Sequence, residues 1–81
     1  MFHVLILNSR PRPNEPPVFE GTVSSLLLPG VEGEFEILDF HKPIVSRLKN
    51  GVIVADNAKE LPIRGGVAKM ELQSLIAVVD L

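Results

Sequence analysis

The stretch "PGVEGEFEILDFHKP", residues 29–43, places four acidic residues, two glycines and a histidine between two prolines. Within it, carboxylates and apolar residues alternate. Because successive side chains of a β-strand point to opposite faces, this alternation separates an apolar side from an acidic side. The apolar side holds Val31, Phe35 and Ile37, and the acidic side holds Glu32, Glu34 and Glu36. We therefore predict a strand that packs its apolar groups inward and keeps its carboxylates in water.

The rest of the chain divides into apolar pieces of similar length. Six glycines and seven prolines separate the pieces, a density typical of many strands rather than of a few helices. The predicted strands cover residues 3–7, 17–21, 22–28, 34–38, 43–48, 51–55, 60–64, 66–70 and 74–79. Strands of this length and spacing predict an all-β fold, either a small sandwich or a barrel. A chain of 81 residues corresponds to one domain, which we expect to span residues 1–81.

Three sites between these pieces carry turn or edge signals. Asn50-Gly51 tolerates positive φ, so the chain should reverse or kink there. Residues 56–58, Asp-Asn-Ala, should form a hairpin tip, because Asp and Asn side chains bond to their own backbone. Pro62 has no N–H for a ladder, so its strand should lie at a sheet edge or carry a break.

Residues 9–17, "SRPRPNEPP", contain four prolines. This density prevents regular strand pairing and favours an extended surface loop. We interpret the segment as a stiff connector inside the domain; a Pro-rich ligand for an SH3-like partner is the alternative.

The C-terminal third fits two kinds of secondary structure. Four apolar residues have the i, i+3, i+4, i+7 spacing of a helix face. They are Leu72, Leu75, Ile76 and Val79. Against a helix stand the Gly65-Gly66 pair and the run "LIAVV", which suits a strand buried on both faces. We predict a hairpin with its turn near residues 71–74.

Composition argues against several classes of function. Eight Lys and Arg, scattered along the chain, stand against ten Asp and Glu, so no basic face is available for nucleic acid. The longest apolar run, residues 75–79, is far shorter than the ~20 residues that span a bilayer. The N-terminus lacks the basic start and cleavage site of a signal peptide, and there is no cysteine. These features favour a cytosolic-type compartment.

The acidic stretch gives little support to a ligand site. A phosphate cradle is disfavoured, because Gly30 and Gly33 lack the Lys-Ser/Thr of a P-loop and the nearby carboxylates repel phosphate. A metal site has suitable donor atoms, but alternating carboxylates on one strand face do not converge on one point. Those donors are Glu32, Glu34, Glu36, Asp39 and His41.

Catalysis has less support still. The chain has no cysteine, no glycine-flanked serine nucleophile, and its two histidines, His3 and His41, lie in different segments. We therefore predict a binding or structural role, with no catalytic residue, no metal and no cofactor.

Four blocks of the chain together resemble a known family. They are "VFEG" (18–21), "LPGVEGEFEIL" (28–38), "HKPIVSRLKNG" (41–51) and "RGGVAKM" (64–70). In the same order the family has Phe-x-Gly, Pro-Gly-x-x-Gly-Glu-Phe-Gly-Ile-Leu, His-Ala-Pro-Leu, Leu-Lys-x-Gly and Gly-Gly-Phe-x-Glu-Val. Over essentially its whole length, the chain resembles the N-terminal domain of the epsilon subunit of F-type ATP synthases, called delta in mitochondria.

The resemblance implies a flattened sandwich of two antiparallel sheets, with a hairpin in the C-terminal third. It implies a non-catalytic subunit at the foot of the rotor's central stalk. Such a subunit joins the gamma subunit to the polar loops of the membrane c-ring, so that ion flow is coupled to ATP synthesis. It would lie peripherally, as part of F1, on the cytoplasmic face of an energy-transducing membrane, which it would meet only through the complex.

The resemblance also implies which residues make subunit contacts. Carried over to this sequence, Glu34 and His41 should face gamma and the c-ring, with Glu32 a weaker candidate beside them. Lys42 stands where the family has a small residue and adds a charge near this contact. Glu36 replaces a family glycine, which leaves open whether a turn or bulge must accommodate it.

Further departures concern the core, the Pro-rich loop and the C-terminus. Val67 stands where the family usually has Phe, so we expect a less filled core there. Arg10 or Arg12 in the longer Pro-rich loop is a candidate to reach a neighbouring subunit. The family commonly continues into a helical hairpin that binds ATP or blocks rotation; this chain ends at Leu81, and we expect that device to be missing.

The alternative function comes from a different class of protein. It is a free-standing β-sandwich that binds a metal or another ligand through an acidic strand face. The residues in question are Glu32, Glu34, Glu36 and His41.

Overall fold

The computed structural model describes residues 1–39 and 42–81. In this part of the chain there are nine strands and no helix. They are β1 (Phe2–Asn8), β2 (Phe19–Val23), β3 (Ser25–Gly30), β4 (Gly33–Leu38), β5 (Ile44–Leu48), β6 (Gly51–Ala55), β7 (Lys59–Ile63), β8 (Gly65–Glu71) and β9 (Ser74–Asp80). Each overlaps a predicted strand, and the largest shift is at the β2–β3 break, which falls at Ser24 rather than after Gly21.

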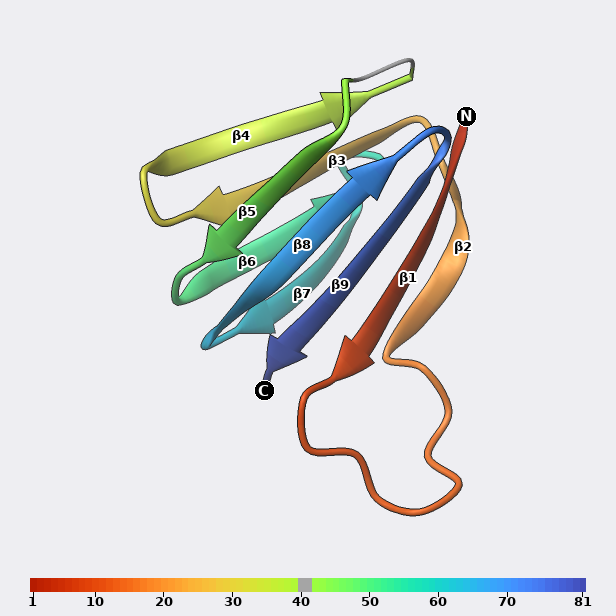
Figure 1. Ribbon diagram of the computed structural model, residues 1–81, viewed down its shortest axis with the longest axis vertical. Coiled ribbons are helices and arrows are strands. Elements are labelled where there is room, and N and C mark those ends of the chain that lie inside the picture. Colours follow the sequence, from red (N-terminus) through yellow and green to blue (C-terminus); the bar gives the residue numbers. More distant parts are fainter. Residues whose placement is uncertain (40–41) are drawn as a thin grey trace.

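The strands form one curled sheet whose two halves face each other as layers (Figure 1). The strand order is β2-β1-β9-β8-β5-β3-β6-β7, with β4 paired to the other edge of β3. One layer therefore runs from β2 to β5 and the other from β4 to β7. The single pair Gly30↔Leu48 joins them at a corner between β3 and β5. The predicted all-β sandwich is confirmed, with one departure from antiparallel pairing, because β1 and β9 run parallel.

Every strand contributes apolar side chains to the core between the layers, and removal of this surface from water drives the folding. The buried set is Phe2, Val4, Ile6, Val23, Leu26, Leu28, Ile37, Leu48, Ile53, Ala55, Ile63, Ala68, Met70, Leu75, Ala77 and Val79. In β4, Ile37 is buried and Phe35 half-buried, which confirms the predicted inward side. Val31 was assigned to that side wrongly, because it lies in the β3–β4 turn and is exposed.

The corner explains the role of the Asn50-Gly51 pair. Both β5 and β6 run antiparallel to β3, so the chain keeps its direction and only kinks between them. Neither Asn50 nor Gly51 has positive φ. Instead, a Cβ on Gly51 would lie 2.6 Å from the Cβ of Pro29 in β3. The glycine is therefore required for close approach of two strands, not for a left-handed turn.

The predicted tip at residues 56–58 is confirmed as the β6–β7 hairpin. Asp56 and Asn57 have φ of 52° and 56°, as in a type I′ turn, and the Ala58 N–H donates to the Ala55 carbonyl at 3.0 Å. Pro62 lies in β7, which among the described strands pairs with β6 alone, so its predicted edge position is also confirmed.

The C-terminal third is the predicted hairpin. Its two strands pair from Gly65↔Asp80 to Glu71↔Ser74, and Leu72 in the turn has a φ of 53°. The expectation that the "LIAVV" run is buried on both faces is wrong for this chain, since residues alternate between buried and exposed along β9. Val67 is also exposed, on the outward side of β8, so it leaves no gap in the core.

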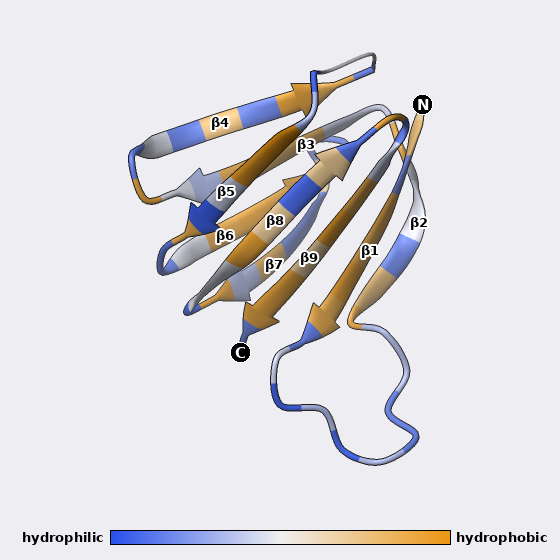
Figure 2. Ribbon diagram, viewed as in Figure 1, coloured by the Kyte–Doolittle hydropathy of each residue, from blue (hydrophilic) through white to orange (hydrophobic). Residues whose placement is uncertain are grey.

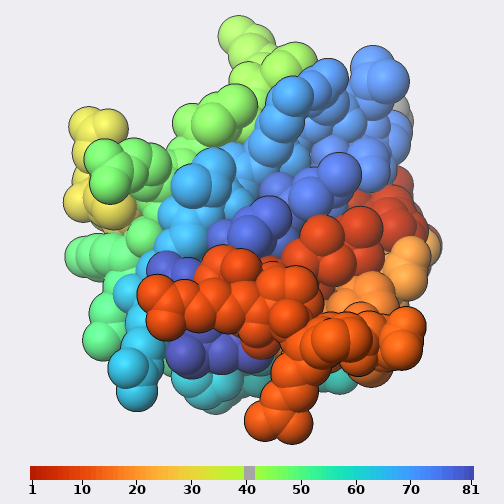
Figure 3. Space-filling view, turned by 60° about the horizontal axis from the view of Figure 1, so that its bottom comes forward, coloured from red at the N-terminus to blue at the C-terminus, as the bar shows by residue number. Residues whose placement is uncertain are grey.

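Residues 9–18 connect β1 to β2 and contain a turn that interrupts an extended path. Asn14 has a φ of 63°, and the Glu15 N–H donates to the Arg12 carbonyl at 3.1 Å. The Glu15 carboxylate accepts bonds from the Asn8 side chain and the Arg12 N–H, both at 3.3 Å. In Figure 3 the loop, in orange, gathers at one end of the molecule beside the blue C-terminal strand.

Candidate subunit-contact site

Of the residues predicted to contact other subunits, the three that the structure describes do not all lie together. Glu32 lies in the turn before β4, Glu34 lies at the start of β4, and Lys42 lies beyond its far end. A strand rises about 3.4 Å per residue, so the path from Glu34 to Leu38 alone is about 14 Å long. His41 lies outside the described residues. The structure thus brings Glu32 and Glu34 together and keeps Lys42 apart from them.

We call residues 31–34 the acidic turn. A hollow lies between this turn and β5, and side chains of both signs line it. A neighbouring hollow, which shares Val31 and Arg47 with the first, extends across the ends of β8 and β9. The acidic turn therefore lies at the edge of two adjoining hollows, which continue toward β8 and β9.

Among the described residues, no ion pair involves the three glutamates on the outward side of the β3–β4 turn and β4. The ion pairs of the described residues are Met1–Asp39, His3–Glu20 and Lys69–Glu71. None of them involves Glu32, Glu34 or Glu36. Residues 1–39 and 42–81 also contain no group of three or more potential metal ligands close enough to hold an ion; His41, one of the four donors of the ligand-binding alternative, lies outside these ranges. Glu36 fits a regular strand without positive φ, so neither a turn nor a bulge is needed there.

A second surface, which sequence reasoning missed, is the outward side of β5, β8, β9 and β1. We call it the outer face. Strand register aligns its side chains in two rows across the strands. The rows are Leu5–Ile76–Lys69–Val45 and Leu7–Val78–Val67–Arg47. Six of these eight residues are apolar, and the two cations lie toward the β5 side.

Four of the six apolar residues of the outer face are exposed, and Leu5 and Leu7 are half-buried. Relative exposure is 67% for Val45, 48% for Ile76, 47% for Val67 and 41% for Val78. In Figure 2, hydrophobic colour runs along nearly all of β9 and β1, whereas β4 is banded. The ion pairs Lys69–Glu71 and His3–Glu20 involve outward residues of the same layer. An exposed apolar patch with charged side chains in and beside it is typical of a protein–protein contact surface.

The sequence did contain a signal for this surface. A strand with apolar residues at every position, as in "LIAVV", is expected when both faces are covered. In β9 the inward positions are covered by the core and the outward positions Ile76 and Val78 by nothing in the described chain. A strand that is apolar on both faces but covered on only one, as β9 is in the described chain, indicates that a partner covers the other face.

No helix in the described part of the chain is long and apolar enough to cross a membrane. The fold is a small β-sandwich, and the acidic turn and the outer face are its two candidate contact surfaces. A family model for the ATP synthase delta/epsilon chain, beta-sandwich domain, matches residues 13–80, and the chain belongs to this family.

Curated relatives agree with this assignment. The chain is 39% identical over 67 residues to the ATP synthase epsilon chain of Campylobacter curvus (strain 525.92), covering 78% of this chain and 52% of the relative. It is 32% identical over 65 residues to that of Rhodopseudomonas palustris (strain BisA53), covering 76% and 48%. The chain thus spans about half the length of the curated relatives it matches.

A solved structure shares the fold at low sequence identity. It comes from a cryo-EM structure of the Tetrahymena thermophila mitochondrial ATP synthase central stalk and c-ring. The TM-score is 0.74 at 12% identity, covering 98% of this chain and 63% of that chain. At this identity the likeness supports the sandwich architecture.

Proposed function

We propose that this chain is a non-catalytic subunit of the central stalk of a rotary F-type ATP synthase. In this role it joins the gamma subunit to the c-ring, so that ion flow and ATP synthesis are coupled, at the cytoplasmic face of the membrane. Family membership and the epsilon-chain relatives support the assignment. The chain would act through its contacts alone.

The observation that carries the proposal is the exposed outer face. Permanent interfaces between subunits are more hydrophobic than transient ones and resemble a domain core cut in half. A joint inside a rotor must not dissociate during turnover, so its main contact should be of this kind. We assign the outer face, centred on Ile76, Val78 and Val67, to gamma.

The acidic turn suits a different contact. Exposed carboxylates set orientation and association rate more than affinity. Glu34 and Glu32 would therefore meet polar or basic groups on the c-ring loops. Because Lys42 lies beyond the far end of β4, we assign it to a separate contact, on the gamma side. His41 precedes Lys42 in the sequence and is proposed for the same contact on that ground alone.

The test is binding of the 81-residue chain to the gamma subunit and to the c-ring of the same host, measured separately. The variant Ile76→Asp buries a charge in the outer-face contact and should lose gamma binding. Glu34→Gln should retain gamma binding and weaken c-ring binding. His41→Ala should weaken gamma binding and retain c-ring binding. Glu60→Gln, an exposed charge on the edge strand β7, is the matched control and should change neither.

Circular dichroism of each variant verifies that a loss of binding is not a loss of folding. A folded wild-type chain that binds neither gamma nor the c-ring would overturn the proposal and favour the ligand-binding alternative. Gamma binding unaffected by Ile76→Asp would retain the stalk role but remove the outer face from it.

A further inference from the structure

We propose that the outer edge of β4 binds an extended partner segment by strand addition, and that this segment alternates basic and apolar side chains. The inference does not rest on the stalk role, although Glu34 belongs to both proposed contacts. It follows from which backbone groups of β4 are left unpaired, and from the side chains beside them.

The direction of the backbone groups in β3 can be determined from two hydrogen bonds. The Ser25 carbonyl accepts from the Asp56 N–H at 3.0 Å, and the Pro29 carbonyl accepts from the Lys49 N–H at 2.8 Å. Both carbonyls therefore point toward β6 and β5. Because backbone groups alternate sides along a strand, the groups of Leu26, Leu28 and Gly30 point the other way, toward β4.

This alternation determines the hydrogen-bonded pairs between β3 and β4. The register has no bulge, so Leu26↔Ile37, Leu28↔Phe35 and Gly30↔Gly33 are the pairs that exchange bonds. The N–H and C=O groups of Glu34 and Glu36 consequently point away from β3. No other described strand pairs with β4, and Figure 1 shows it at the margin of the fold. Its outer edge is therefore a row of free donors and acceptors.

An exposed edge of this kind is a template for a further strand. Side chains define what that strand must carry. Glu34 and Glu36 are exposed on one face of β4, and Phe35 is half-buried on the other. A strand added beside them would place alternate residues next to the carboxylates and the intervening residues next to Phe35. Charge complementarity therefore favours Lys or Arg at one set of positions and apolar residues at the other.

The same carboxylates disfavour a second copy of this chain as the occupant. Two β4 edges paired with each other would place Glu34 and Glu36 of both copies on neighbouring positions. Like charges opposite each other in a sheet are destabilising. The acidic edge thus resists self-association and selects a partner of opposite charge.

The test uses the peptide acetyl-Lys-Val-Lys-Val-Lys-Val-amide and amide hydrogen exchange followed by NMR on the full chain. Without peptide, the amides of Glu34 and Glu36 should exchange fast, and those of Phe35 and Ile37 slowly. With peptide, Glu34 and Glu36 should become protected while Phe35 and Ile37 change little. This every-second-residue pattern distinguishes strand pairing from charge attraction alone.

Two variants of Glu36 separate the contribution of its backbone N–H to peptide binding from the contribution of its charge. Glu36→Pro removes an outward N–H without removing a bond to β3, and proline is tolerated at an edge. It should weaken peptide binding about tenfold or more, as expected from the loss of a backbone hydrogen bond. Glu36→Gln keeps that N–H and should keep the alternating protection at reduced affinity.

A second peptide tests the backbone hydrogen bonds without changing the protein, in case Glu36→Pro does not fold. A peptide of the same sequence with backbone N-methyl groups on its three lysines retains its charge and side chains, but it loses the N–H groups that face β4 when the lysines lie opposite Glu34 and Glu36. It should bind at least about tenfold more weakly than the parent peptide. Equal binding of the methylated peptide, or binding without protection of Glu34 and Glu36, overturns the proposal.

Discussion

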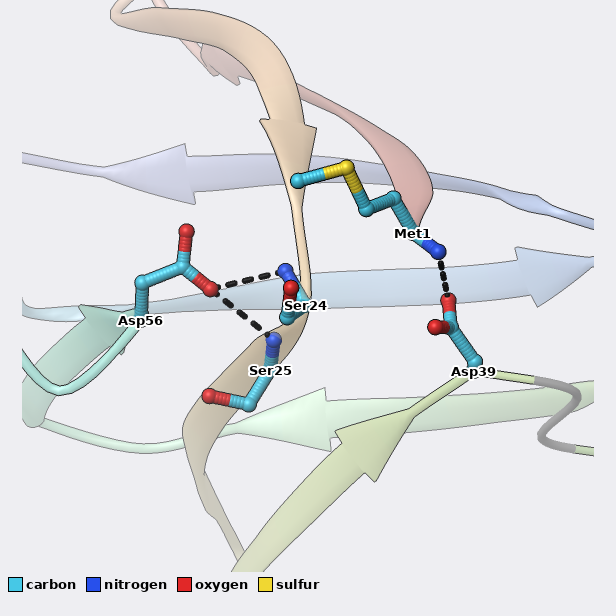
Figure 4. Close-up of polar contacts among 5 residues, drawn as sticks. All are labelled: Met1, Ser24, Ser25, Asp39 and Asp56. Carbon is cyan, nitrogen blue, oxygen red and sulfur yellow. Dashed lines mark hydrogen bonds and ion pairs between the residues drawn. The ribbon is translucent and has the colours of Figure 1, made fainter.

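The carboxylate of Asp56 accepts the backbone N–H groups of both Ser24 and Ser25, at 2.7 and 3.1 Å (Figure 4). One side chain at the tip of the β6–β7 hairpin thereby fixes the bend at Ser24, where β2 ends and β3 begins. The Asp56 N–H in turn donates to the Ser25 carbonyl at 3.0 Å.

Removing this carboxylate should destabilise the fold. Glycine is the suitable replacement, because Asp56 has positive φ and Asp56→Gly removes the side chain without backbone strain. We expect a loss of roughly 1–3 kcal/mol in the free energy of unfolding, measured in urea, from the two charge-assisted bonds. Asn57→Gly, at the neighbouring position with positive φ, is the control and should change stability by less than about 0.5 kcal/mol. Equal stability of the two variants would contradict the role of Asp56.

The corner between the layers should not tolerate a methyl group at Gly51. In Gly51→Ala the new Cβ would overlap Pro29, and we expect a destabilisation of about 1–3 kcal/mol from overpacking. Gly21→Ala is the comparison, since its nearest contact is an ordinary 3.4 Å to the Phe19 ring, and thermal unfolding should show little change. A Gly51→Ala variant with wild-type melting temperature would mean that β3 and β6 can separate without cost.

Buried and exposed residues alternate along β9, so truncating two adjacent side chains should change the free energy of unfolding by different amounts. Leu75 is fully buried, so Leu75→Ala should cost roughly 2–5 kcal/mol. Ile76 faces outward, and Ile76→Ala should cost less than about 1 kcal/mol in the isolated chain. Chemical denaturation of the two variants measures the difference. A large cost at Ile76 would show that the outer face is covered by the chain itself.

Glu15 should restrain the Pro-rich loop. Its carboxylate holds Asn8 and Arg12, so Glu15→Ala should increase the mobility of the loop with a stability loss under about 1 kcal/mol. Heteronuclear relaxation of the Arg10, Arg12 and Asn14 amides measures this change on the picosecond-to-nanosecond timescale. Unchanged relaxation in Glu15→Ala would show that the prolines alone order the loop.

Sequence reasoning predicted the strands well because short apolar pieces between glycines and prolines leave few alternatives. The hairpin tip at Asp56 and the edge position of Pro62 followed from the local chemistry of single residues. The kink at Asn50-Gly51 was predicted for the wrong physical reason. Its cause is the packing of Gly51 on Pro29, a contact between distant parts of the chain that no local pattern contains.

The candidate site was harder to predict. Alternation in β4 indicated which side chains face water, but a strand's length separates Glu34 from Lys42, and proximity in sequence had suggested one site. The outer face was missed because an apolar run was attributed to complete burial. Whether a strand's second face is covered depends on the layers around it, and these are not encoded in the strand itself.

The join between the layers has a mechanical consequence. Along the path from β2 to β7, the ladder narrows at the single pair Gly30↔Leu48, flanked by the bonds Val31 N–H to Arg47 carbonyl and Lys49 N–H to Pro29 carbonyl. At this corner the continuous ladder between the layers rests on these two bonds; elsewhere the layers are held by the apolar core and by the chain segments that cross between them. Continuity of hydrogen bonding from one layer to the other is therefore thinnest at Gly30 and Leu48, and loss of these two bonds would leave the layers joined by the core and the chain crossings.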